Sequence, residues 1–76
     1  MTIVVTPFKA VFRNYCWENS ISPLKVVLIS NEKDFYKLYG CEFTMNDVVF
    51  LDDWFEIPNV QDFLVSKAKL TPSNKV

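Results

Sequence analysis

The feature that most limits how this chain can fold is the amount of aromatic side chain in so short a sequence. Twelve of the 76 residues are aromatic, but there is only one glycine and there is no histidine. A domain of this size buries only about 60% of the surface that its unfolded chain exposes, and each buried ring removes roughly 150–250 Å² from water. We therefore predict one domain over residues 1–70, with about eight or nine rings in its core, and a frayed tail over 71–76. The remaining rings are candidates for binding a partner.

The charge balance argues against two classes of partner. Eight basic and nine acidic residues give a formal net charge of −1, whereas proteins that bind nucleic acid usually carry a basic excess. No apolar run reaches the ~20 residues needed to cross a bilayer, and residues 1–5 lack the basic region of a signal peptide. We expect a soluble, cytoplasmic protein with no membrane contact.

The sequence lacks the residues on which most active sites depend. Without histidine it has no usual general base, and with one glycine it has no phosphate-binding loop. Cys16 and Cys41 cannot form a four-ligand zinc site by themselves and are expected to be reduced thiols. Asp52 and Asp53 are adjacent, so in a strand they would point to opposite faces. We predict no catalysis, no cofactor and no metal.

One helix is specified by its start, its apolar face and its end. Ser30 or Asn31 can cap residues 31–39, and acidic side chains in the first turn suit the helix dipole. Phe35, Leu38 and Tyr39 form one apolar stripe at helical spacing. Gly40 stands where a helix commonly ends in a left-handed backbone conformation.

The segments around this helix are expected to be mainly strands. Residues 24–29 and 47–51 are rich in β-branched and apolar side chains, as buried strands are. Residues 54–57 could form a short return strand that ends at Pro58, and Asn59 could cap a second helix over 60–69.

Residues 6–17 fit two structures. Phe8, Val11, Phe12, Tyr15 and Cys16 have helical spacing, but the β-branched and aromatic content favours a strand. With a strand here, the expected fold is α+β, in the order ββαββα. This fold would have a mostly antiparallel sheet of about four strands, with two helices on one face. If residues 6–17 are helical, the order becomes βαβαβα and the sheet becomes parallel.

The segment after the strand at 47–51 is the main candidate for a binding site. It places two large rings and an aliphatic side chain among three carboxylates: Asp52, Asp53, Trp54, Phe55, Glu56 and Ile57. One interpretation is that a ring fills the core while the acids keep the loop soluble. In the other, a ring anchors a partner and the carboxylates steer its basic rim. In an extended segment adjacent rings point to opposite faces, so one of them would be exposed.

A second candidate surface mixes aromatic and basic side chains near the N-terminus: Phe8, Lys9, Phe12, Arg13, Tyr15 and Trp17. On a sheet, such rings can stack on single-stranded bases. Three basic residues, with Lys25 included, are few for a groove that follows phosphates. An amphipathic strand with its rings inward is the simpler interpretation.

These observations favour a non-enzymatic protein-binding module. Asn, Lys, Phe, Tyr and Ile, whose codons are AT-rich, make up more than a third of the chain. This composition suggests a phage or mobile-element protein that inhibits or redirects a host protein by occupying a functional surface. Two alternatives stay open: a structural subunit or virion component that forms oligomers, and a single-stranded nucleic-acid binder.

Overall fold

The computed structural model describes residues 1–68. It contains three strands, two α-helices and four 3₁₀ segments. In chain order they are β1 (Thr2–Val5), α1 (Lys9–Glu18), η1 (Pro23–Lys25), β2 (Val26–Ile29), η2 (Glu32–Leu38), η3 (Met45–Asp47), β3 (Val48–Phe50), η4 (Trp54–Glu56) and α2 (Val60–Lys67). The expected frayed tail, and the end of the predicted second helix at residue 69, lie outside the described residues.

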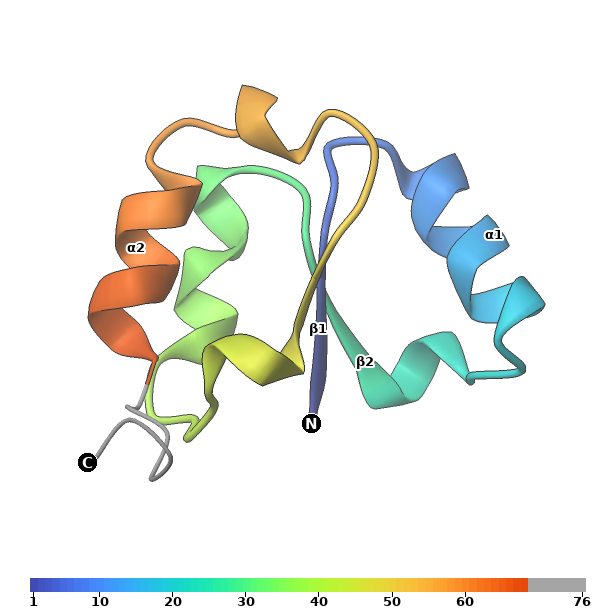
Figure 1. Cartoon of the computed structure of the whole chain (residues 1–76), viewed down its shortest axis with the longest axis horizontal. Coiled ribbons are helices and arrows are strands. Elements are labelled where there is room, and N and C mark those ends of the chain that lie inside the picture. The colour runs from blue at the N-terminus through green and yellow to red at the C-terminus, as the bar shows by residue number, and fades with distance from the viewer. Residues whose placement is uncertain (69–76) are drawn as a thin grey trace.

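The sheet is parallel, with strand order β2-β1-β3. Ile3 of β1 is in register with Val27 of β2 and with Val48 of β3. The expected four-stranded, mostly antiparallel sheet is therefore wrong. Parallel neighbours cannot be joined by a hairpin and need a crossover connection, which α1 provides between β1 and β2 (Figure 1).

The segment that was expected to be a strand forms most of α1. Phe12 and Cys16, four residues apart, are both buried on the inner side of this helix. They pack with Val4 of β1 and Val26 of β2 into one of two apolar clusters. The helix prevails over β propensity because β1 is buried on both faces and needs a cover on this one.

The second apolar cluster fills the opposite face of the sheet, where η2 and α2 pack (Figure 1). Its buried members are Ile3, Val5, Ile29, Leu38, Phe43, Ile57, Val60 and Leu64. Alternate residues of β1 thus feed different clusters, as the period of a strand requires. The result is three layers, with α1 on one face and η2 with α2 on the other.

The helix predicted over 31–39 has the expected ends but is a 3₁₀-helix, η2. The Asn31 side chain accepts a hydrogen bond from the Lys33 N–H at 2.8 Å, and Gly40 has the left-handed φ of 80°. Asp34 accepts two hydrogen bonds from Ser30, one from its backbone N–H and one from its hydroxyl, both at 2.8 Å.

Three smaller predictions are wrong at particular residues. Leu24 is not in the strand; it lies in η1 and is 96% exposed. Residues 54–57 form no return strand, because η4 occupies Trp54–Glu56. The side chain of Asn59 does not cap α2 but donates a hydrogen bond to the Glu32 carboxylate at 3.0 Å, which ties α2 to η2.

Asp34 should make stability depend on pH. Burial raises its pKa, but the two bonds from Ser30 and the Lys37 ammonium at 3.3 Å outweigh burial and lower the pKa below the ordinary value of 3.8. A lowered pKa stabilises the fold above the ordinary value, and this contribution disappears as the pH falls through the lowered one. Asp34→Ala should therefore reduce the free energy of unfolding by about 1–2 kcal/mol near pH 7.

Urea denaturation from about pH 2 to pH 7 checks this prediction. The difference between wild type and Asp34→Ala should shrink once the pH drops below 3.8. Glu18→Ala, which removes an exposed carboxylate, is the matched control and should change stability little. A difference that stays constant over the whole pH range would contradict this role of Asp34.

Candidate functional site

The candidate segment leaves the carboxyl edge of the sheet next to the central strand. Thr6 directly follows β1 and is buried, and its hydroxyl donates a hydrogen bond to the Asp52 carbonyl at 2.9 Å. The Leu51 N–H donates to the Val5 carbonyl at 3.0 Å. These two bonds fix the chain that leaves β3 against the end of β1. The carboxyl edge of an open parallel sheet is the usual location of binding sites.

A left-handed residue then turns the two rings in different directions. Asp53 has a φ of 58°, which Asp tolerates better than most residues do. The chain continues into η4, where Trp54 is half-buried against the second apolar cluster. Phe55 points outward and is 67% exposed. Although the segment is not extended, one of the two adjacent rings is exposed, and this ring is Phe55.

The exposed ring rests on other rings. The Trp54 ring lies 4.5 Å from Phe50 and 6.1 Å from Phe55, measured between ring centres. The Trp54–Phe55 pair is edge-to-face, with an interplanar angle of 83°, which is a favourable geometry for aromatic side chains. Trp54 therefore supports Phe55 rather than acting as a second exposed anchor.

The other members of the predicted site also differ in how far they are exposed. Asp52 and Glu56 are exposed and Asp53 is half-buried. No Lys or Arg among residues 1–68 forms an ion pair with these three carboxylates. Ile57 is 3% exposed and belongs to the core, so it offers a partner little surface. The structure thus brings together Phe55 and three carboxylates at the surface.

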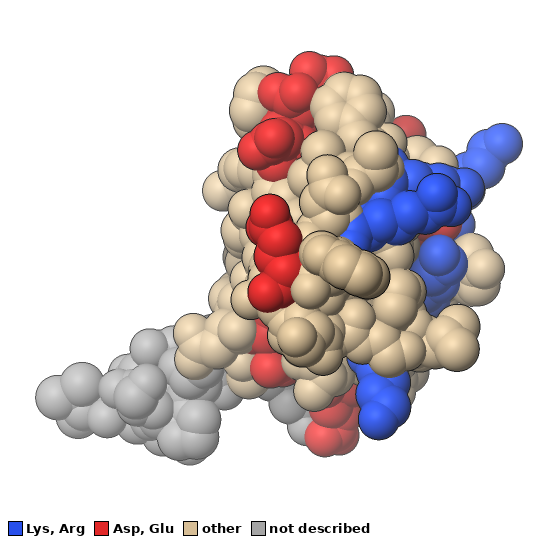
Figure 2. Space-filling model, turned by 90° about the vertical axis from the view of Figure 1, so that its right-hand side faces the viewer, with Lys and Arg blue, Asp and Glu red and all other residues tan. Residues whose placement is uncertain are grey.

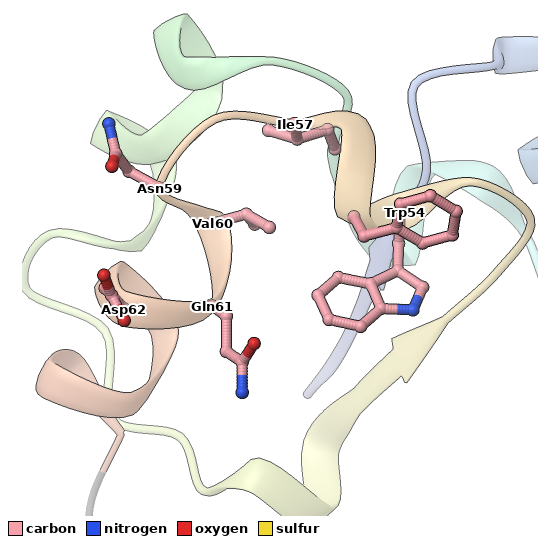
Figure 3. A pocket seen from close by; sticks show the side chains of 7 residues that line it. Trp54, Ile57, Asn59, Val60, Gln61 and Asp62 are labelled. Atoms are coloured by element: carbon pink, nitrogen blue, oxygen red, sulfur yellow. The ribbon is translucent and has the colours of Figure 1, made fainter.

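A hollow of about 220 Å³ lies beside these rings, between η4 and the start of α2. Figure 3 shows Gln61 of α2 pointing into the space beside the Trp54 indole. The lining combines rings, aliphatic groups and polar side chains: Trp54, Phe55, Ile57, Asn59, Val60, Gln61 and Asp62. Such a hollow could receive one side chain of a partner.

The second candidate surface is a helix face and not a sheet platform. Lys9, Arg13 and Trp17 recur every four residues along α1 and are exposed, with Trp17 at 86%. Tyr15 is half-buried against the cluster under α1. Figure 2, which views the molecule from the α1 side, shows basic groups gathered on one side of this face and acidic groups on the other.

Leu24 and Phe50 are among the exposed apolar residues that were not identified from the sequence. Leu24 looked like the start of a strand, because nothing in Pro23 to Lys25 separates a 3₁₀ turn from an extended segment. Phe50 is at the end of β3 and is 37% exposed. Alternation along a strand that follows Asp47 could have indicated that one of its apolar residues faces outward.

The chain was compared with known proteins, and its described residues were searched for membrane spans and metal ligands. Comparisons of the chain with protein-family models, curated proteins and solved structures find no match. Within residues 1–68, no helix is long and apolar enough to cross a membrane. Over the same residues, no three His, Cys, Asp or Glu side chains come together as metal ligands would. Cys16 and Cys41 are both free thiols.

The different burial of the two adjacent rings predicts different effects of their removal. Trp54→Ala should lower the free energy of unfolding by about 2–3 kcal/mol, because it empties a half-buried position against the core. Phe55→Ala should cost less than about 1 kcal/mol, since its ring is mostly in water. Thermal and urea denaturation of both variants measure these two losses of stability. Equal losses would contradict the assignment of Trp54 as support and Phe55 as the exposed ring.

Proposed function

We propose that this chain is a non-enzymatic protein-binding module that uses Phe55 as an apolar anchor within an acidic rim. The observation that carries the proposal is a 67% exposed phenylalanine whose ring packs edge-to-face against Trp54. Large apolar side chains that stay in water in the free protein become favourable contacts when a partner covers them. The Phe55 ring contacts Trp54 in the free protein, and a side chain that is held before binding loses less entropy on binding.

The surrounding charges indicate what kind of partner this site would accept. Asp52, Asp53 and Glu56 carry negative charge beside Phe55 and have no cationic partner within residues 1–68. A partner with Lys or Arg around an apolar pocket would complement them, and such complementarity raises association rates at low salt. We propose a host protein with a basic surface as the target, bound in the cytoplasm by a phage or mobile-element protein that inhibits or redirects it.

Affinity capture from lysate of the native host tests this proposal. The chain should retain one stoichiometric protein at low salt, and Phe55→Ala should lose it without losing its own fold. Val65→Ala, which removes a 59% exposed valine from α2, is the control and should still capture the protein. Raising the salt should weaken capture because exposed charges are screened. Equal capture by Phe55→Ala and the wild type would overturn the assignment of the site.

A second function, self-association as a structural subunit, is favoured by one specific observation. Trp17 and Leu24 are 86% and 96% exposed, so a second copy of the chain could cover them. If they form a contact between copies, sedimentation should show an oligomer that Trp17→Ala dissociates. A monomer at all concentrations tested would remove this alternative.

A further inference from the structure

The two edges of the sheet differ in whether their outward backbone N–H and carbonyl groups are hydrogen-bonded. In β3, the Leu51 N–H bonds to the Val5 carbonyl, and the parallel register pairs Val49 with Val4. Alternate residues of a strand face the same neighbour, so Val49 faces β1 while Val48 and Phe50 face outward. The Val48 N–H donates a hydrogen bond to the Met45 carbonyl. No group in residues 1–68 bonds to the Phe50 N–H or the Val48 carbonyl.

The β2 edge is protected by side chains of η2. The outward carbonyl of Leu28 accepts a hydrogen bond from the Lys37 ammonium at 3.4 Å. Two residues further, the outward N–H of Ser30 donates to Asp34 at 2.8 Å, and the Val26 N–H donates to the Pro23 carbonyl. Lysine over an edge is a common device against unwanted strand pairing. Among the residues that the structure describes, nothing equivalent covers β3, and we refer to it as the open edge of this sheet.

We propose that the β3 edge binds an extended, basic segment of another protein as a fourth strand. The inference rests on the proposed function, because it specifies how the partner reaches the surface around Phe55. The Val48 carbonyl and the Phe50 N–H would make the main-chain hydrogen bonds. Strand addition gains affinity from the backbone and specificity from pockets for alternate side chains.

Hollows for alternate side chains lie on both faces next to the end of β3. On the α2 face is the hollow of about 220 Å³ at Trp54, whose ring contacts Phe50. On the α1 face is one of about 260 Å³, lined by Val11, Asn14, Tyr15, Glu18, Leu51 and Asp52. Successive side chains of an added strand point to opposite faces. One can therefore enter each hollow.

The charges at this edge indicate which kind of segment would bind there. Asp47 precedes β3, and Asp52 and Asp53 follow it. A second copy pairing antiparallel through its own β3 would place Asp47 of one chain at the end of the pair where Asp52 and Asp53 of the other lie, and like charges across paired strands are destabilising. The β2 edge of a second copy is already occupied by Lys37. A segment with Lys or Arg beside its apolar residues, from a different protein, suits this edge best.

Selection from a displayed library of random twelve-residue peptides tests the proposal, with the immobilised wild-type chain as target. Enriched peptides should alternate apolar residues and carry Lys or Arg. Phe50→Pro and Phe50→Ala then form a matched pair, since both remove the ring but only proline also removes the outward N–H. Binding of a synthetic enriched peptide should be about tenfold weaker for Phe50→Pro than for Phe50→Ala, as expected for one lost backbone hydrogen bond.

A second measurement keeps the test valid if Phe50→Pro does not fold. In the wild type, hydrogen exchange at the Phe50 amide should slow on adding the peptide, and N-methylation of alternate peptide residues should abolish binding. Failure to enrich any peptide, equal binding by the two variants, or an unchanged Phe50 amide would each overturn strand addition. If a captured host protein is lost in Phe55→Ala but bound equally by Phe50→Pro and Phe50→Ala, this inference fails while the proposed function stands.

Discussion

Everything else in this fold depends on the burial of three consecutive residues of the central strand, β1. Ile3, Val4 and Val5 of β1 are each 0% exposed, and each such side chain contributes roughly 1.5–3 kcal/mol when it leaves water. Since neighbouring residues of a strand point to opposite faces, this burial needs cover on both sides of the sheet. α1 covers one side and η2 with α2 cover the other. Of the twelve rings, however, only Phe12 and Phe43 are buried and six are exposed. The prediction of eight or nine rings in the core is therefore wrong, because aliphatic side chains form most of it.

The central strand also positions the candidate site. Thr6, the residue after β1, is the buried polar side chain of the described core, and its hydroxyl bond to the Asp52 carbonyl satisfies it. This bond anchors the chain just before the left-handed turn at Asp53. Phe55 is therefore carried by backbone that is tied to the most buried part of the molecule. An anchor on rigid backbone loses little freedom on binding.

How much could be predicted from the sequence depended on whether the information was local. The ends of η2 follow from Asn31 and Gly40, and the approximate strands at 24–29 and 47–51 and the helix from residue 60 follow from local apolar patterns. α1 was assigned to a strand because Phe8, Val11 and Phe12 fit both periods, and only the two-sided burial of β1 decides between them. η4 depends on the Thr6–Asp52 bond, which joins residues 46 apart in the chain. No local pattern reveals such a bond.

The same limits apply to the candidate site. Its position and its acidic character followed from the run Asp52 to Glu56, and so did the conclusion that one of two adjacent rings is exposed. Which ring it is, and the burial of Ile57, depend on how η4 packs on the core. The open edge of β3 could not be foreseen either, because the sequence indicates no strand order and the expected sheet was mostly antiparallel.

The most direct test of a binding surface formed by Phe55 and the β3 edge is a backbone amide NMR titration of the wild-type chain with its captured partner. The largest shift changes should fall between Val48 and Glu56, with smaller ones in the first turn of α2. Changes concentrated on Lys9, Arg13 and Trp17 of α1, with Val48 to Glu56 unaffected, would contradict the account and assign binding to the opposite face of the sheet.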